Sequence, residues 1–73
     1  MLETKRLAEA ERYKGNEFMK TKDFPEAISS YSKSINDDPN EAATYSNRAL
    51  AYLRQKQYGL VIEDSNKCLE LDP

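Results

Sequence analysis

The sequence lacks histidine and tryptophan and has a single cysteine, Cys68. One cysteine cannot form a disulfide within the chain, and without histidine the usual zinc sites and imidazole bases are excluded. No acid–base pair, metal-ligand set or phosphate-binding loop stands out, so we expect no catalytic residue, no bound metal and no cofactor. The chain is therefore predicted not to be an enzyme.

Long apolar runs are also absent. The longest uncharged apolar run, residues 58–62, is far shorter than the roughly 20 residues that a membrane span needs, and the charged segment that follows Met1 is unlike a signal peptide. The formal net charge is -2, whereas nucleic-acid binding requires concentrated positive charge. These features predict a cytoplasmic protein that has no membrane or nucleic-acid partner.

The dominant feature of the sequence is helical periodicity. Apolar and small residues recur every three or four positions, and no stretch alternates apolar and polar residues for long enough to form a strand. Asp23 and Asn40, each next to a proline or one residue from it, are expected to cap the second and third helices. The pattern predicts an all-α fold of four antiparallel helices, at about 4–21, 24–37, 41–55 and 58–71.

The second half of the chain repeats the first at an offset of 34 residues. The offset aligns Pro39 with Pro73, Asp38 with Asp72, Phe18 with Tyr52, Ile28 with Ile62 and Ile35 with Leu69. A period of this length with two helices per unit resembles the tetratricopeptide repeat (TPR) family. The resemblance implies a solenoid of helical hairpins, with an N-terminal extension of the first helix at residues 1–7, a first repeat at 8–41 and a second repeat at 42–73.

Aromatic residues occupy positions that the family uses for packing, and Gly15 occupies a small-residue position of the first repeat. We expect the rings to belong to the core, rather than to face a ligand. The second repeat departs from the family pattern at Val61 and Ser65, where alanine and an aromatic residue are usual. The aromatic residues concerned are Phe18, Tyr31, Tyr45 and Tyr52.

Three polar residues resemble the carboxylate-clamp subclass of TPR co-chaperones. Arg12 and Asn16 are four residues apart, which places them on one helix face, and Asn47 lies on the third helix. The resemblance implies that the three bind the C-terminal carboxylates of a heat-shock chaperone tail ending in Glu-Glu-Val-Asp. Taken singly, each also fits an ordinary solvent-facing helix residue. Lys14 and Arg48 are candidates for secondary contacts in the same groove, although Arg48 equally fits a role in packing between helices.

Charge is divided between the helices. Residues 4–22 hold six Lys or Arg against three Glu, and residues 41–56 hold three Lys or Arg against one Glu, whereas residues 23–40 and 57–73 each carry a net charge of -3. In the family, the first helix of each repeat lines the concave face. The predicted concave face is therefore basic and would attract an acidic peptide.

Two repeats are fewer than the roughly three, with an end cap, that such arrays generally need. The 73 residues are expected to end the array without a third repeat or a capping helix, and the third repeat would carry the two remaining basic positions of the clamp. An uncapped second repeat favours a homo-oligomer. The alternative function is accordingly a structural or oligomerisation element that packs against another helix or self-associates, without binding a chaperone tail.

Overall fold

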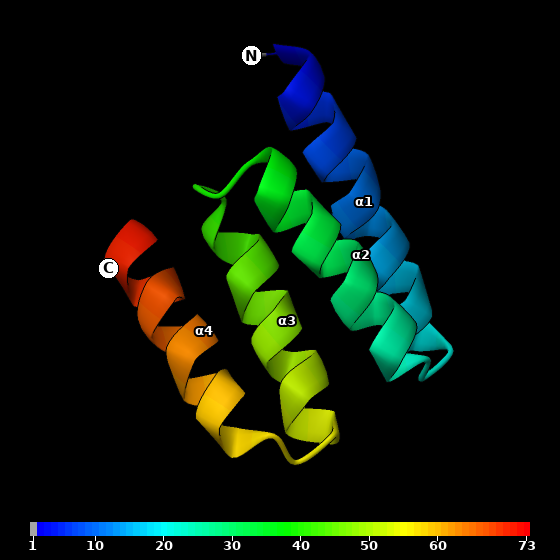
Figure 1. The fold of residues 1–73 in the computed structure, drawn as a ribbon, viewed down its shortest axis with the longest axis vertical. Helices are drawn as coiled ribbons and strands as arrows, with labels where there is room; N and C mark the ends of the chain where they lie inside the picture. The colour runs from blue at the N-terminus through cyan, green and yellow to red at the C-terminus, as the bar shows by residue number, and fades with distance from the viewer. Residues whose placement is uncertain (1) are drawn as a thin grey trace.

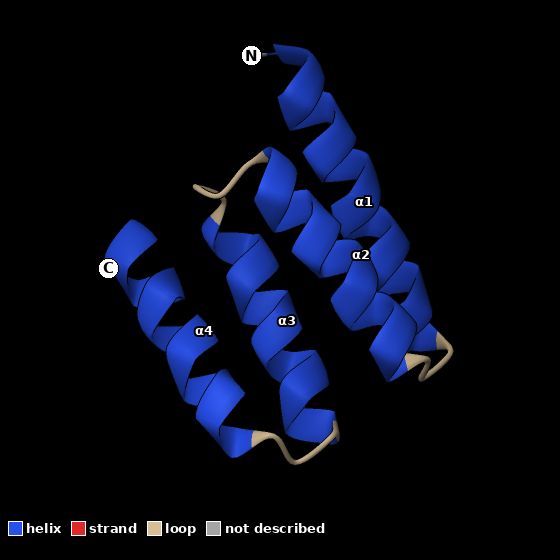
Figure 2. Ribbon diagram, in the orientation of Figure 1, coloured by secondary structure: helices blue, strands red, loops and turns tan. Residues whose placement is uncertain are grey.

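The computed structural model describes residues 2–73, and within that range the chain forms four helices joined by short turns (Figure 1, Figure 2). The predicted all-α fold is confirmed, and two of the four helices have the predicted bounds. The division into repeats at 8–41 and 42–73 stays a prediction, as does the extension at 1–7, whose first residue lies outside the described residues. The helices are α1 (Leu2–Lys20), α2 (Phe24–Asp37), α3 (Ala42–Arg54) and α4 (Tyr58–Leu71).

The helices lie side by side in the order of the sequence and alternate in direction (Figure 1). Each helix packs against the next one, and α1 also reaches α3 across one side of α2. The resulting layer measures 34 × 28 × 15 Å. The contact between α1 and α3 matters for function, because it brings together the helices that carry the candidate binding residues.

The turns within the two hairpins have the same geometry. Lys22 and Lys56 have φ angles of 63° and 61°, in the left-handed region that commonly ends a helix. The amide of the next residue donates back to a helix carbonyl in both turns, from Asp23 to Phe18 at 2.8 Å and from Gln57 to Tyr52 at 3.0 Å. Since the paired residues are 34 positions apart, the repeat seen in the sequence extends to the backbone.

The helix starts differ from the predicted ones. Asn40 does not cap α3, so that prediction is wrong; α3 begins one residue later, and the Glu41 carboxylate accepts from the amide of Ala43 at 3.4 Å. Asp23 precedes α2, but its side chain makes no capping hydrogen bond to the helix and instead accepts from the Thr21 hydroxyl at 2.7 Å. Both helix starts are therefore weakly capped.

Small residues hold α1 and α2 close together. Ala8, Gly15 and Ala27 are buried, and the buried Ser34 hydroxyl donates to the Ala8 carbonyl at 2.6 Å. The ring of Tyr31, only 1% exposed, lies directly against Gly15. Of the predicted core aromatics, Tyr31 and Tyr45 are buried, whereas Phe18 and Tyr52 are half-buried.

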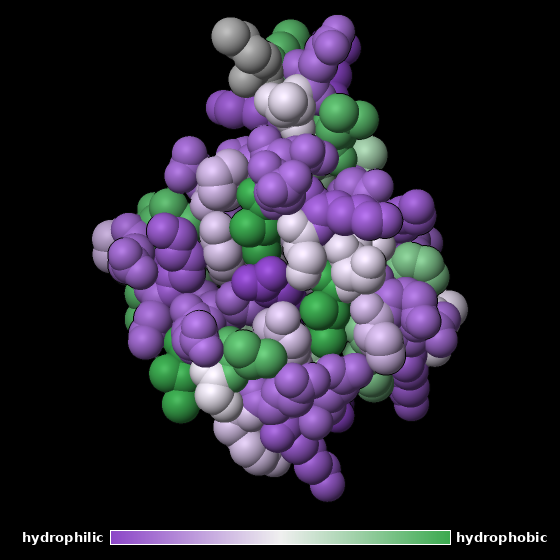
Figure 3. All heavy atoms as spheres, in the orientation of Figure 1, coloured by the Kyte–Doolittle hydropathy of each residue, from purple (hydrophilic) through white to green (hydrophobic). Residues whose placement is uncertain are grey.

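One side of α4 exposes apolar side chains. Tyr58, Ile62 and Leu69, which share this side of the helix, are 58%, 61% and 60% exposed. Figure 3 shows hydrophobic patches, separated by hydrophilic residues, at the edge of the layer that α4 forms in Figure 1. In the described part of the chain, no helix combines the length and the apolar character needed to cross a membrane.

Candidate functional site

The side chains of Asn16 and Asn47 meet between α1 and α3. The Asn47 amide nitrogen donates to Asn16 Oδ1 at 3.0 Å, although the two residues are 31 positions apart in the sequence. Both side chains are half-buried, so they remain accessible from the surface. The structure therefore brings together two of the three residues that are predicted to bind the carboxylate of a ligand.

Tyr31 of α2 completes this polar group. Its hydroxyl donates to the same Asn16 Oδ1 at 2.6 Å. Burial raises the pKa of the Tyr31 phenol above its ordinary value of 10.0, and the positive charge of Arg12 opposes part of that rise. Tyr31 thus stays a neutral donor at physiological pH, beneath the asparagine pair. The sequence suggested only a packing role for this residue.

Arg12 lies one helical turn before Asn16 and is half-buried. Its guanidinium lies 5.1 Å from the centre of the Tyr13 ring, a distance at which a cation interacts favourably with an aromatic face. It borders a shallow hollow between α1, α2 and the start of α3, whose charged lining residues are Lys5, Glu9, Arg12, Asp38 and Glu41. The three acidic side chains of this hollow weaken the positive electrostatic field around Arg12.

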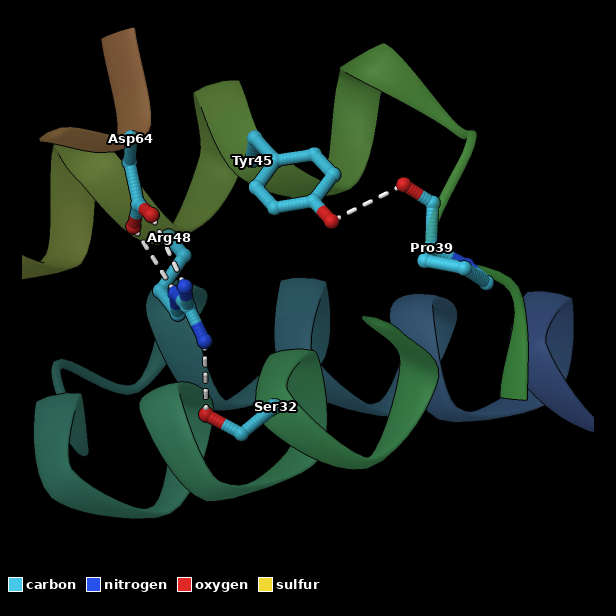
Figure 4. A network of polar contacts seen from close by, with 5 residues as sticks. All are labelled: Ser32, Pro39, Tyr45, Arg48 and Asp64. Carbon is cyan, nitrogen blue, oxygen red and sulfur yellow. Dashed lines mark hydrogen bonds and ion pairs between the residues drawn. The ribbon is translucent and has the colours of Figure 1, made fainter. Parts of the chain in front are cut away.

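The structure places the two candidate secondary residues away from the asparagine pair. Lys14 is exposed and borders a depression between α1 and α2, together with Glu26 and Lys33. Arg48 extends between α2 and α4 (Figure 4), where its Nε and Nη2 donate to the two oxygens of Asp64, each at 2.8 Å, and its Nη1 donates to Ser32 Oγ at 3.1 Å. This position fits the packing alternative for Arg48.

A second hollow lies between the C-terminal ends of α1 and α3 and the start of α2, beyond the asparagine pair. Its apolar lining comes from Met19, Phe24 and Leu50. Its basic residues were not singled out by the sequence analysis, although two of them, Lys20 at four residues from Asn16 and Arg54 at seven residues from Asn47, had a usable helical spacing. They are Lys20, Lys22 and Arg54.

The basic character of the α1 and α3 surface is thus uneven. The hollow beside Arg12 contains acidic side chains as well as basic ones, whereas the hollow beyond the asparagine pair is lined by basic and apolar residues alone. Between the two hollows, the amides of Asn16 and Asn47 supply hydrogen-bond donors. Such a surface suits an extended ligand that has carboxylate groups and at least one apolar side chain. No cluster of metal-ligating side chains was found among residues 2–73.

Two family models together match residues 15–73 of the chain. A model described as TPR repeat matches residues 15–56, and one described as Tetratricopeptide repeat matches residues 42–73. Among curated proteins, the chain is similar to Hsp70-Hsp90 organizing protein 3 of Arabidopsis thaliana, with 45% identity over 92% of the chain, and to Serine/threonine-protein phosphatase 5 of Homo sapiens, with 42% identity over 89% of the chain. The chain spans only 12% and 13% of the length of these relatives.

Two solved structures have the same fold. The first TPR of Spaghetti (RPAP3), bound to the HSP90 peptide SRMEEVD, superposes with a TM-score of 0.92 at 32% identity. The TPR2B domain of yeast Sti1, in a complex with pHsp70, superposes with a TM-score of 0.91 at 37% identity. In both cases the match covers 93% of this chain and 54% of the solved chain.

Proposed function

Because this chain belongs to the tetratricopeptide repeat family, we propose that it is a peptide-binding module that recognises the acidic C-terminal tail of a heat-shock chaperone. The observation that supports this most directly is the meeting of Asn16 and Asn47 between α1 and α3, one turn from Arg12. The names of the relatives and the peptides bound by the two solved neighbours point to the same class of ligand. The module itself has a binding role, and any catalysis would reside in other parts of a longer protein.

We assign the ligand's terminal carboxylates to Arg12, Asn16 and Asn47. A guanidinium and two amides can each donate to a carboxylate, and such charge-assisted bonds contribute about 1.5–3 kcal/mol. Upstream glutamates would lie near Lys20, Lys22 and Arg54, and an apolar side chain would contact Met19 or Leu50. Two further basic positions of the clamp subclass have no counterpart in the 73 residues, so we expect weak binding by these two repeats alone.

We expect Asn16→Ala and Asn47→Ala each to weaken binding of a Glu-Glu-Val-Asp peptide by about tenfold, since each removes one bond to the carboxylate. Isothermal titration calorimetry measures the change, and the exposed Asn66→Ala on α4 is the matched control. The C-terminally amidated peptide should bind the unmodified chain much more weakly than the free acid. Equal binding of the two peptides, or unchanged affinity in both variants, would exclude the clamp.

The exposed apolar face of α4 favours a second function, self-association through this face. Beside it, Ala49, Cys68 and Leu69 line a further hollow between α3 and α4. A second copy of the chain would cover the exposed leucine and isoleucine side chains of this face, and its hydrophobic burial would stabilise a dimer.

Leu69→Glu should abolish this association, because it places a charge in the apolar face. Sedimentation velocity at increasing concentration measures it, and Leu7→Glu is the matched control, since Leu7 is similarly exposed (58% against 60%) but lies on α1. A chain that stays monomeric at the highest concentrations, or a Leu7→Glu variant that behaves like Leu69→Glu, would rule out the α4 face.

A further inference from the structure

Tyr31 is almost completely buried, and its hydroxyl contacts the asparagine pair from the protein interior. Its side chain is 1% exposed, and its ring is held against Gly15, where an added Cβ would come within 2.6 Å of the Tyr31 Cε1 atom. The ring therefore has little freedom to move. Its hydroxyl is fixed at 2.6 Å from Asn16 Oδ1, on the side of that amide away from the surface.

The orientation of the Asn16 amide decides which group faces a ligand. Oδ1 accepts from both the Tyr31 hydroxyl and the Asn47 amide, so Nδ2, which has no partner among the described residues, is free to donate. A carboxylate accepts hydrogen bonds but donates none. With the amide flipped, Asn16 would present its oxygen to the carboxylate, and the contact would become repulsive.

The asparagine pair cannot select this orientation alone. Each amide carries both donors and an acceptor, so Asn47 can rotate to donate to Oδ1 of Asn16 or to accept from its Nδ2. The Tyr31 hydroxyl removes this ambiguity as long as it donates to Asn16, as it does here. The positive charge of Arg12 acts on the phenol, which favours an arrangement with the oxygen lone pairs toward the guanidinium and the O–H bond toward Asn16.

We infer that Tyr31 is a positioning residue, whose hydroxyl holds the Asn16 amide with its Nδ2 toward the bound carboxylate. The identity of the ligand rests on the proposed function, whereas the orientation of Asn16 does not. Tyr31 thus makes the ligand specificity of the surface at Asn16 depend on packing in the core of the first hairpin. The role concerns selectivity for a free carboxylate and not the overall stability of the fold.

Tyr31→Phe tests this role, because it keeps the ring against Gly15 and removes only the hydroxyl. The matched control is Tyr45→Phe: Tyr45 is also buried, at 6% exposed, and its hydroxyl donates to the Pro39 carbonyl at 2.8 Å (Figure 4) and not to either asparagine. The readout is the ratio of affinities for the Glu-Glu-Val-Asp peptide and its amidated form. We expect Tyr31→Phe to lower this ratio by about tenfold, the effect of one lost charge-assisted bond, and Tyr45→Phe to leave it unchanged.

A second measurement needs no peptide. In the nuclear magnetic resonance spectrum, Asn16 should give one set of side-chain amide signals in the unmodified chain and in Asn47→Ala, where Tyr31 still fixes the amide. In Tyr31→Phe these signals should double or broaden through exchange. Failure of the unmodified chain to prefer the free acid would refute the proposed function, and the amide signals would still decide the role of Tyr31.

Either of two results would overturn the inference. One is an unchanged preference for the free acid in Tyr31→Phe, together with an unchanged single set of Asn16 signals. The other is doubled Asn16 signals in Asn47→Ala, which would mean that Asn47 and not Tyr31 fixes the amide. Should Tyr31→Phe not fold, the Asn47→Ala spectrum decides alone.

Discussion

Asp64→Ala should lower the free energy of unfolding by about 2–4 kcal/mol, because it leaves the Arg48 guanidinium without its counter-ion between three helices. The Asp64 side chain is 6% exposed and that of Arg48 is 19% exposed, so the loss is expected below the full value for a completely buried pair. The hydrogen bond to Asp64 raises the pKa of Arg48, and the arginine stays charged in the variant. A domain of this size has a free energy of unfolding of only about 4–11 kcal/mol.

The surroundings of Arg48 explain why the loss extends beyond one ion pair. The guanidinium also donates to Ser32 on α2, and it lies 5.9 Å and 5.7 Å from the ring centres of Tyr45 and Tyr52. The side chain therefore connects α2, α3 and α4 at one point (Figure 4). Without Asp64, the Arg48 guanidinium stays among these groups as a charge without a counter-ion. In addition, α4 loses its best-buried side chain.

Urea unfolding measures the change, and Glu63→Ala is the matched control, since it removes the same charge from the adjacent, exposed position of α4. The control should change the free energy of unfolding by less than about 0.5 kcal/mol. The double variant Arg48→Met with Asp64→Leu should recover most of the loss, because apolar residues can replace a buried ion pair at little cost. A loss in Asp64→Ala no larger than in Glu63→Ala would show that the pair contributes little.

The arrangement of helices could be predicted because it depends on periodicity, which the sequence displays directly. Predicted and observed bounds agree for α2 and α4, and the repeat at an offset of 34 reappears in the turns at Lys22 and Lys56. The turns themselves could not be predicted from local signals. Both place a lysine in the left-handed region, where glycine is the usual marker.

The candidate site was only partly visible in the sequence. Asn16 and Asn47 came from the resemblance to clamp proteins, and their meeting depends on the contact between α1 and α3. The Tyr31 hydroxyl was missed, because a tyrosine at a core spacing indicates packing, and the reach of its hydroxyl depends on how closely Gly15 lets the ring approach. The sequence did indicate that Asp64, the partner of Arg48, would be buried. Asp64 lies three residues after Val61 and four before Cys68, on the half-buried stripe of α4.

The second prediction with a large expected effect on stability compares the two glycines of the chain. We expect Gly15→Ala to destabilise the fold, because adding atoms to a filled core usually costs about 1–3 kcal/mol. The new Cβ would lie 2.6 Å from Cε1 and 2.7 Å from Cδ1 of Tyr31, and the buried ring cannot move without disturbing Asn16. The preference of a helix for alanine over glycine, worth about 1 kcal/mol, acts against this cost, so we expect a net loss of up to about 2 kcal/mol.

Gly59→Ala is the matched control, because it adds the same atom to a helical glycine that has nothing within 4 Å of the new Cβ. Only the helix preference remains there, so Gly59→Ala should stabilise the chain by about 0.5–1 kcal/mol. Thermal unfolding separates the two variants, since 1 kcal/mol corresponds to roughly 4–8 °C for a domain of this size. The same displacement of Tyr31 should lower the preference of Gly15→Ala for a free carboxylate. Equal and stabilising effects of the two substitutions would mean that the Tyr31 ring yields without cost, and the close packing of α1 on α2 would then not hold the hydroxyl beneath Asn16.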